Sequence, residues 1–542
     1  MSAPQDVDGG LPVDDLRAQL RERGYLSHGI ERWFALDPWR SRAFWLELAA
    51  VAGKGAALIG LFAAVPLVAV MLFRNHPLTA VETLLMSLLY GVTAVVFSFL
   101  FLIAVALLLR LRPTLAIDTP RALLAISFVA AAVLAAPIAA WWYRFDAPPQ
   151  TPELIAGLLL IALFFVMATI VVSAALLSFS IYELRRVPVL HQKPRGAAMT
   201  VAAAVLIALL FIPAYATQEK GAPSAPLQVV TTPSTRRIAF VAVDGLTWEL
   251  FRSRRELAGA FSSANDAQPL RGPTAERWAT LGTGVAPGIH GVRAIEGIRF
   301  RGGSHVLQAI SRADFALLEL APHVALARRQ PLPPAVRRRD YVWEIFAARG
   351  VPSAATNWWT TETRRDGALE SVGQETIFAK ADGDIKGIDD VASQRLFEAI
   401  RRNNPRFVTA YFPSLDIILN RVQVDASGRV FTSLLILDGL RQVVRGLRDK
   451  GYDVVLVGLP GEGQSGRAVV AATFNLAPAA PLDLAPTLCA LEGFPPSAEM
   501  AGRSLAGDAP RIATYGARAS ASASTRVNEE YYQSLRSLGY IR

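Results

Sequence analysis

Two segments of the chain carry side chains that could act on an anionic substrate. Asp244-Gly245 directly follows the apolar run 238–243. A carboxylate at the end of a buried strand is well placed to bind a hard or borderline metal ion. Thr274 follows Pro273 at the start of a helical pattern. A hydroxyl there lies beside free backbone N–H groups and the positive end of the helix dipole, which suits a nucleophile that attacks phosphorus or sulfur.

The same residues also have purely structural interpretations. Asp-Gly pairs commonly form turns, and a Thr at a helix start is a preferred N-cap. Arg277 lies within one helical turn of Thr274, so it could contact a phosphate oxygen, or it could be solvated or ion-paired. We expect His290, in a His-Gly turn, to be structural rather than a metal ligand. The sequence alone leaves these alternatives open.

Several spaced motifs together resemble the type I phosphodiesterase / nucleotide pyrophosphatase branch of the alkaline phosphatase superfamily. That family has a strand ending in Asp-Gly, a Thr or Ser nucleophile, a Thr-Gly pair, a Pro and a His-Gly pair. The resemblance covers most of residues 236–506. The matching motifs are Asp244-Gly245, Thr274, Thr283-Gly284, Pro287, His290-Gly291, Tyr341-Val342-Trp343, Asn357-Trp358-Trp359, the run from Tyr411 to Asp416, the run from Leu482 to Leu488, and Gly502-Arg503-Ser504-Leu505.

The resemblance assigns roles to three of these residues. It implies that Asp244 is a metal ligand, that Asp416 is a ligand of a second metal, and that Thr274 is the nucleophile that is transiently phosphorylated. Membrane-anchored relatives such as phosphoethanolamine transferases and lipoteichoic acid synthases pair a comparable anchor with such a domain.

The chain departs from the family pattern where imidazole ligands are needed. Asn420 stands where the family has a His, four residues after Asp416. The run Gly458-Leu459-Pro460-Gly461 stands where the family has Ser-Asp-His-Gly, and no histidine follows His323. Two carboxylates, a hydroxyl and an amide cannot enclose two zinc ions with ordinary coordination numbers. We therefore expect no ordinary two-zinc site.

A reduced metal site remains as the cofactor alternative. Oxygen ligands suit hard cations, so Asp244 and Asp416 could hold a single Mg²⁺ or Ca²⁺. Glu462 could add one further carboxylate.

Alternating strand and helix patterns predict the fold around these residues. The alternation indicates an α/β domain with a mostly parallel sheet covered by helices on both faces, and functional groups gather at the carboxyl ends of such strands. We expect strands at 238–243, 406–412, 453–458 and 467–473, and helices at 247–259, 341–349, 392–402, 434–450, 482–493 and 528–539.

The first part of the chain reads as a membrane domain. The 542 residues have a mean hydropathy of +0.33, which is too apolar for an average soluble protein. The excess lies in five stretches long enough to cross a bilayer, none with a charged residue in its middle, so we favour an anchor over a transporter. The five predicted transmembrane helices are 55–73, 84–109, 122–142, 154–181 and 197–216.

The Lys/Arg asymmetry of the connections predicts the orientation. Basic residues cluster before the first span and in the second and fourth connections, so we expect a cytoplasmic N-terminus and an extracytoplasmic, periplasmic location after Ala216, in a multi-pass protein of the cell (inner) membrane. The predicted parts are a cytoplasmic or interfacial segment 1–46, the transmembrane domain 47–216, a linker 217–235, the alkaline-phosphatase-like domain 236–508 and a tail 509–542.

Composition limits the classes of partner that the chain is expected to bind. Much of the net charge of +10 flanks the spans, and no basic stripe interleaved with aromatic residues argues for nucleic acid. Cys489 is the only cysteine, which rules out an intrachain disulfide. We expect the lipid bilayer as one partner, and a phosphate-ester ligand or a protein of the cell envelope as another.

Two functions follow from these observations. The first is a pseudoenzyme that keeps the fold and serves a binding or scaffolding role in the cell envelope. The alternative is a metal-dependent phosphodiesterase or phosphoryl-group transferase that acts on envelope phosphate esters through Thr274.

Overall fold

The computed structural model of the chain forms two compact units. One comprises 1–218 with 311–324, and the other comprises 219–310 with 325–542. The structure describes residues 42–73, 79–111, 120–144, 151–185, 234–303, 305–308, 317–507, 510–518 and 528–541, together with residues 15, 19, 22 and 231.

Among its described residues, the first unit contains four long helices. The bounds are Arg42–Phe73 for α3, Ala80–Leu111 for α4, Pro120–Arg144 for α5 and Thr151–Arg185 for α6. Helix α3 packs against α4 and α6, and α5 packs against α6. Backbones approach closely where Gly60 of α3 meets Gly91 of α4, because a Cβ on Gly60 would lie 2.7 Å from the carbonyl oxygen of Gly91. Such small-residue contacts are typical of packed membrane helices.

Two segments of the described helices are long and apolar enough to cross a membrane, Val81–Leu108 and Arg121–Ala140. Only 11% of the most apolar window of the first is buried, and its exposed side chains include Leu84, Leu88 and Leu100. The predicted five spans are therefore not confirmed as five. The fifth, 197–216, lies outside the described residues, as do most of the N-terminal segment 1–46 and most of the linker 217–235.

The second unit is built on a mixed sheet of eight strands in the order β2-β11-β10-β1-β9-β6-β8-β7. The five strands from β10 to β8 run parallel, and β2, β11 and β7 pair antiparallel. The predicted mostly parallel sheet is thus confirmed. The bounds are Ile238–Asp244 for β1, Ser263–Ala267 for β2, Ser353–Thr356 for β6, Arg364–Asp366 for β7, Leu369–Val372 for β8, Phe407–Phe412 for β9, Asp453–Leu459 for β10 and Ala468–Ala472 for β11.

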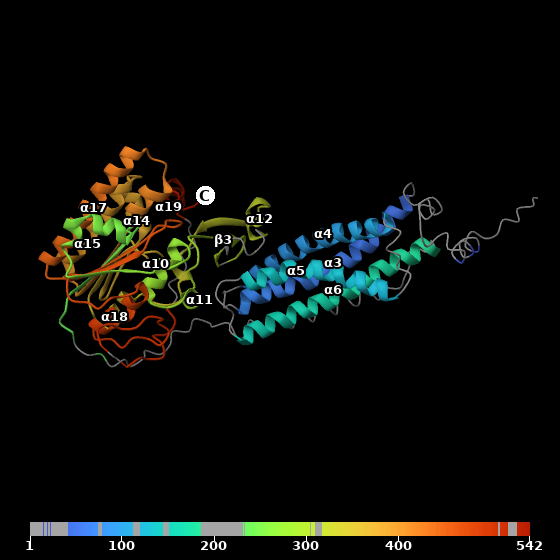
Figure 1. Ribbon diagram of the computed structural model, residues 1–542, viewed down its shortest axis with the longest axis horizontal. Helices are drawn as coiled ribbons and strands as arrows, with labels where there is room; N and C mark the ends of the chain where they lie inside the picture. Colours follow the sequence, from blue (N-terminus) through green and yellow to red (C-terminus); the bar gives the residue numbers. More distant parts are fainter. Residues whose placement is uncertain are drawn as a thin grey trace, which may run out of the picture. The chain divides into compact units, whose positions relative to one another are not determined.

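Every residue of β1 and β9 is buried, as expected for central strands covered on both faces. In Figure 1, α15 (Ile385–Asn403) and α17 (Ala426–Asp449) lie on one side of this sheet and α18 (Leu484–Leu491) lies on the other. The remaining helices of the unit are α8 (Trp248–Ser253), α9 (Arg255–Ala258), α10 (Thr274–Thr283), α11 (Pro287–His290), η2 (Pro334–Val336), α13 (Val342–Ala347), α14 (Gln374–Ala381), α16 (Ser414–Asp416), η3 (Ile417–Arg421), η4 (Pro481–Asp483) and α19 (Glu529–Ser537).

A small second sheet, with the order β4-β3-β5, lies between α11 and α13 in the sequence. Its strands are Glu296–Phe300 for β3, Leu307–Gln308 for β4 and Ala327–Pro331 for β5. The intervening helix α12 spans Leu317–His323. The sequence patterns did not predict this sheet.

Candidate functional site

The candidate residues gather at the carboxyl ends of three adjacent strands. Asp244 ends β1, the segment that contains Asp416 follows β9, and a loop that contains Glu462 follows β10. Strands β10, β1 and β9 are neighbours in the sheet and run parallel. Their carboxyl ends therefore lie at one edge, which is where ligands bind in open α/β sheets.

Asp244 is fully buried at this edge. The next residue, Gly245, has φ +82°, and a Cβ there would lie 2.6 Å from the backbone nitrogen of Asp416. Glycine is therefore required both for the turn and for the close approach of the segment that carries Asp416. The Tyr411 hydroxyl donates to Asp244 Oδ2 at 3.0 Å. Burial and the negative charge of Asp416 raise the pKa of Asp244 to about 7, although Arg277 and Arg421 oppose the shift.

Thr274 is the first residue of α10, and its side chain is fully buried. The N-cap is Pro273, and the Thr274 hydroxyl does not cap the helix. This hydroxyl instead accepts from Nη2 of Arg421 at 2.7 Å and, more weakly, from Nη2 of Arg277 at 3.4 Å. It donates to Oε2 of Glu462 at 3.3 Å. A hydroxyl has one donor and two acceptor positions, so all three are in use.

Arg421 links the candidate ligand Asp416, the candidate nucleophile Thr274 and Glu462. Its Nε donates to Oδ2 of the fully buried Asp416 at 2.5 Å, and its Nη2 lies 3.6 Å from Glu462 Oε2. Only 8% of the Arg421 side chain is exposed. Burial lowers the pKa of Arg421, but Tyr540, Asp416 and Asp244 together raise it above the ordinary value. The guanidinium is therefore a permanent cation between the two strand ends.

Arg277 supplies a second cation. Its side chain is 4% exposed, and its Nη2 lies 3.6 Å from Asp244 Oδ1. Its Nη1 donates to the carbonyl oxygen of Pro460 at 2.6 Å. Arg277 is thus ion-paired with Asp244, and its contact with a phosphate oxygen stays a prediction.

Asn420 presents its amide nitrogen, rather than its oxygen, to the neighbouring acceptors. Nδ2 donates to Asp416 Oδ1 at 2.8 Å and to Gln464 Oε1 at 3.3 Å. Gln464 also accepts from the backbone nitrogen of Gly461 at 2.7 Å. Asn420 and Arg421 lie in the single π turn η3, and both side chains contact Asp416. Such turns are frequent at functional sites.

Tyr540 borders the site from the last described segment of the chain. The Arg421 guanidinium carbon lies 4.1 Å from the centre of its ring, and the ring meets Trp359 edge-on with centroids 5.4 Å apart. Gly539 has φ +74° and lies against the carbonyl oxygen of Arg421, where a Cβ would approach to 2.8 Å. The aromatic face adds a cation–π contact to the enclosed guanidinium.

The residues present do not fit a divalent metal ion. Both oxygens of Asp416 accept from Asn420 or Arg421, and Asp244 Oδ2 accepts from Tyr411. Asp244 Oδ1 is buried without a hydrogen bond among the described residues, but it faces Arg277. In the part of the chain that the structure describes, no group of three or more His, Cys, Asp or Glu side chains could hold a metal. These carboxylates are instead contacted by the guanidinium groups of Arg277 and Arg421.

His290 has a structural role and makes no contact in the site around Asp244 and Asp416. Its Nδ1 accepts from the backbone nitrogen of Val292 at 3.1 Å, and its Nε2 lies 2.9 Å from the Thr280 hydroxyl. Burial, with help from nearby arginines, lowers the pKa of His290 to about 3. The neutral ring therefore donates from Nε2 and fixes the turn after α10.

The structure brings together all five candidates from the sequence: Asp244, Thr274, Arg277, Asp416 and Asn420. Sequence reasoning missed Arg421, Gln464, Tyr411 and Tyr540. Arg421 gave no signal, because a side chain five residues after Asp416 would point away from it in an α-helix, and the two meet in the π turn. Tyr540 gave none either, because it is separated from its partner Arg421 by more than a hundred residues.

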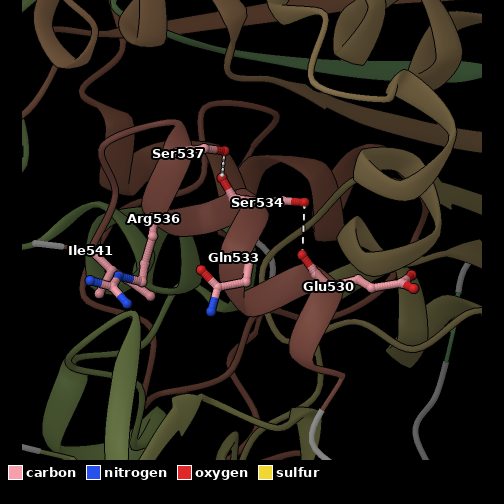
Figure 2. Close-up of a pocket in the computed structure, with 6 residues that line it drawn as sticks. All are labelled: Glu530, Gln533, Ser534, Arg536, Ser537 and Ile541. Atoms are coloured by element: carbon pink, nitrogen blue, oxygen red, sulfur yellow. Dashed lines mark hydrogen bonds between the residues drawn. The ribbon is translucent and has the colours of Figure 1, made fainter.

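A separate depression of about 660 Å³ lies beside α19. It is lined by Glu530, Gln533, Ser534, Arg536, Ser537 and Ile541. Figure 2 shows that the hydroxyls of Ser537 and Ser534 donate to carbonyl oxygens one turn back along the helix. Both hydroxyl protons are therefore already engaged by the backbone. None of these residues belongs to the site at the strand ends.

Residues 238–459 match the model of the type I phosphodiesterase / nucleotide pyrophosphatase family. The matched segment contains β1, α10, β9 and β10, and it ends two residues before Gly461. It makes up about two fifths of the chain, 222 of 542 residues. This match supports the predicted relationship to the alkaline phosphatase superfamily. Comparison with curated proteins gives no match.

Three solved structures are distantly similar. Murine ectonucleotide pyrophosphatase / phosphodiesterase 5 is 12% identical with a TM-score of 0.30, and the alignment covers 41% of this chain and 56% of that protein. Phosphonoacetate hydrolase from Sinorhizobium meliloti 1021 is 11% identical with a TM-score of 0.30, covering 43% and 59%. Lipooligosaccharide phosphoethanolamine transferase A from Neisseria meningitidis, an integral membrane protein, is 10% identical with a TM-score of 0.27, covering 77% and 88%. At these identities and TM-scores, none of the three similarities assigns an activity to this chain.

Proposed function

We propose that the chain is a membrane-anchored pseudoenzyme of the cell envelope. A five-span anchor would hold an extracytoplasmic type I phosphodiesterase-like unit that serves binding or scaffolding and does not turn over phosphate esters. One observation carries this proposal. The guanidinium groups of Arg277 and Arg421 pack against Asp244, Asp416 and Thr274, where the family resemblance implies metal ions.

Charge supports the proposal. Two unit charges 4 Å apart interact by about 4 kcal/mol at an effective dielectric constant of 20. A divalent cation between Asp244 and Asp416 would meet two arginines at this range and would be repelled by each with about twice that energy. The carboxylates already have cationic partners, so a metal would gain little by replacing them.

The state of the nucleophile supports the same conclusion. Attack on phosphorus needs a free lone pair on the Thr274 oxygen and a group that takes its proton. Both acceptor positions of this oxygen are engaged by arginine N–H groups, and the side chain is fully buried. Glu462 could take the proton, but the oxygen has no free lone pair for the attack.

The membrane anchor is supported by the apolar surface of α4 and by the length of Val81–Leu108 and Arg121–Ala140. The Lys/Arg bias predicts that the unit built on β1 faces the extracytoplasmic side. Because Arg277 and Arg421 occupy the carboxylates of the strand-end site, we expect binding to involve the outer surface of the unit, with a protein of the envelope as the favoured partner over a phosphate ester.

Metal content and turnover test the proposal directly. The full chain, purified in detergent, would be analysed for Zn, Mn, Mg and Ca and assayed on a chromogenic phosphodiester with each metal added. We expect substoichiometric metal and no turnover above buffer. Thr274→Ser and Thr274→Ala serve as a matched pair, because Ser keeps the hydroxyl and Ala removes it.

A bound metal at one or two ions per chain, with turnover kept in Thr274→Ser and lost in Thr274→Ala, would overturn the proposal. It would establish the alternative, a metal-dependent phosphodiesterase or phosphoryl-group transferase that uses Thr274. Turnover equal in both variants would point to a contaminating enzyme and would leave the site of this chain inactive.

A further inference from the structure

The connection between β3 and β5 carries exposed apolar side chains in and just after α12. Leu320 is 46% exposed, Val324 is 58% exposed and Leu326 is 36% exposed. The backbone nitrogen of Val324 donates to the carbonyl oxygen of Leu320 at 3.1 Å, so these two side chains lie one helical turn apart on the same face. We call Leu320, Val324 and Leu326 the α12 tip.

The α12 tip is the exposed side of a folded segment. Ala321, one position after Leu320, is fully buried, so α12 has a packed side and an exposed side. Ala327, one position after Leu326, is also buried and pairs with Phe300 of β3. The side chains of the tip are therefore held at the surface by packed neighbours.

Exposed arginines border the α12 tip at the end of the small sheet. Arg301 directly follows β3, and its backbone nitrogen donates to the carbonyl oxygen of Leu326 at 3.0 Å. Arg328 lies in β5, two positions after Leu326. Both arginines are exposed. The whole connection has the same bias, because residues 299–329 contain five arginines and two acidic residues.

The grouping of α12 with the apolar helices indicates what covers the tip. Residues 311–324 belong to the first compact unit, which also contains α3 to α6. Within that unit α12 contacts α4, and the segment Val81–Leu108 of α4 is long and apolar enough to cross a membrane. The α12 tip is therefore part of the unit whose exposed apolar surface would lie in a bilayer.

We infer that the α12 tip inserts into the interfacial region of the bilayer, with Arg301 and Arg328 against anionic headgroups. Apolar side chains bordered by basic ones are typical of segments that lie in the membrane interface, with the apolar face about 5–10 Å deep at the headgroup boundary. Basic side chains near the surface are attracted by anionic lipids. The inference rests on the membrane anchor of the proposed function and adds a contact outside the spans.

Depth-dependent quenching of the full chain tests this contact. The protein would be reconstituted in vesicles of phosphatidylcholine and phosphatidylglycerol, with an environment-sensitive dye on Val324→Cys. The only native cysteine, Cys489, is buried, so the dye reports the introduced position. Nitroxide-labelled lipids place the quencher near the top or near the end of the acyl chain. We expect the shallow nitroxide to quench the dye at least about threefold more than the deep one, as interfacial insertion requires.

Two reference positions separate this inference from the anchor itself. Val92→Cys alters an exposed residue inside Val81–Leu108 and should be quenched most by the deep nitroxide. Gln533→Cys alters an exposed polar residue of α19 and should be quenched by neither. Quenching at position 92 without quenching at position 324 would overturn the inference and leave the anchor standing. Absence of quenching at position 92 would contradict the anchor, whatever position 324 shows.

Charge reversal tests the part given to the arginines. Arg328→Glu in the Val324→Cys background should lower the shallow quenching at least about twofold in vesicles that contain phosphatidylglycerol, because the new carboxylate is repelled by anionic headgroups. Arg445→Glu, which reverses an exposed arginine of α17, is the matched control and should leave the quenching unchanged. Equal quenching in the two variants would overturn the pairing of Arg328 with headgroups.

Discussion

Arg421 contacts Asp416, Thr274 and Tyr540 with a single guanidinium. Replacing it by Ala leaves the Asp416 carboxylate buried without its cation. Removing one partner of a buried ion pair costs about 3–5 kcal/mol. We expect Arg421→Ala to lower the free energy of unfolding of the α/β unit by about this amount, measured by denaturant titration of the full chain with tryptophan fluorescence.

The exposed pair Arg467–Asp266 provides the control for that substitution. Its atoms are 2.8 Å apart, but the side chains are 52% and 37% exposed. Solvated pairs contribute about 0–1 kcal/mol, so Arg467→Ala should change stability by less than about 1 kcal/mol. Equal losses in the two variants would contradict the role given to the buried guanidinium.

The raised pKa of Asp244 predicts that the stability of the α/β unit depends on pH. Burial raises its pKa from 3.8 to about 7. Between these values the folded protein binds more protons than the unfolded chain, so this group's contribution to stability falls as pH rises through the window and levels off above it. Asp389, also buried and raised to about 7, acts in the same direction, and His290 acts in the opposite one.

The Asp244→Asn variant isolates this contribution. The amide cannot titrate, so the variant should gain thermal stability relative to the parent protein as pH rises from about 4 to about 7. The difference between the two midpoints of thermal unfolding at each pH is the measurement. Parallel pH profiles would show that Asp244 is already ionised throughout the range.

The residues of the site could be predicted from the sequence only where a local motif marks them. Asp244 ends an apolar run, Thr274 begins a helix, and Asn420 stands out as an amide at a family imidazole position. The burial of Arg277 and Arg421 at the site could not be predicted in this way, because nothing in the residues around an arginine shows that it is buried. Its partners are fixed by packing between distant strands.

At the scale of elements, the loop after β10 is tightly constrained. A Cβ on Gly461 would overlap the side chains of Asp416 and Asn420. Gly439, in the middle of α17, has nothing within 4 Å of its Cβ position. We expect Gly461→Ala to destabilise the unit by about 1–3 kcal/mol, as overpacking does. Gly439→Ala should stabilise it by about 0.5–1 kcal/mol, and the same titration measures both.

If Gly461→Ala leaves the free energy of unfolding unchanged, the loop can move away from Asp416. In that case the hydrogen bonds of Gln464 and Asn420 would not hold the loop in place.

Strong patterns located the main elements, and tertiary pairing decided the rest. The predicted strands at 406–412 and 453–458 correspond to β9 and β10. The predicted helix 247–259 is wrong as one element, because it breaks at Arg254 into α8 and α9. The strand at 467–473 exists as β11 but runs antiparallel to β10. A strand's direction depends on its connection, which hydrophobic alternation does not encode.

At the scale of the whole molecule, the orientation in the membrane is the main prediction. The Lys/Arg bias predicts that the α/β unit is extracytoplasmic and that the second connection, near Thr114, is cytoplasmic. In intact cells, a membrane-impermeant maleimide should label Arg445→Cys and should label Thr114→Cys only after permeabilisation. The reverse pattern would place the α/β unit in the cytoplasm and contradict the envelope role.

The division of the chain into an apolar first part and an α/β second part could be foreseen from composition, because hydropathy changes abruptly along the chain. The number of spans could not be settled in this way. Val81–Leu108 and Arg121–Ala140 satisfy length and composition among the described helices, whereas Leu48–Ala64 and Ile161–Leu176 are shorter apolar segments. A bundle can include helices that cross only by tilting or with polar ends.

In the metal-free state that we propose, the enclosed guanidiniums would make the α/β unit independent of metal supply. A zinc ion can be withdrawn by a chelator or displaced by acid, whereas an arginine side chain is tethered to the backbone and stays charged. The strand ends joined by Arg277 and Arg421 should therefore keep their arrangement in a metal-starved compartment. Folding would need no loading step, and treatment with EDTA should leave the unit intact.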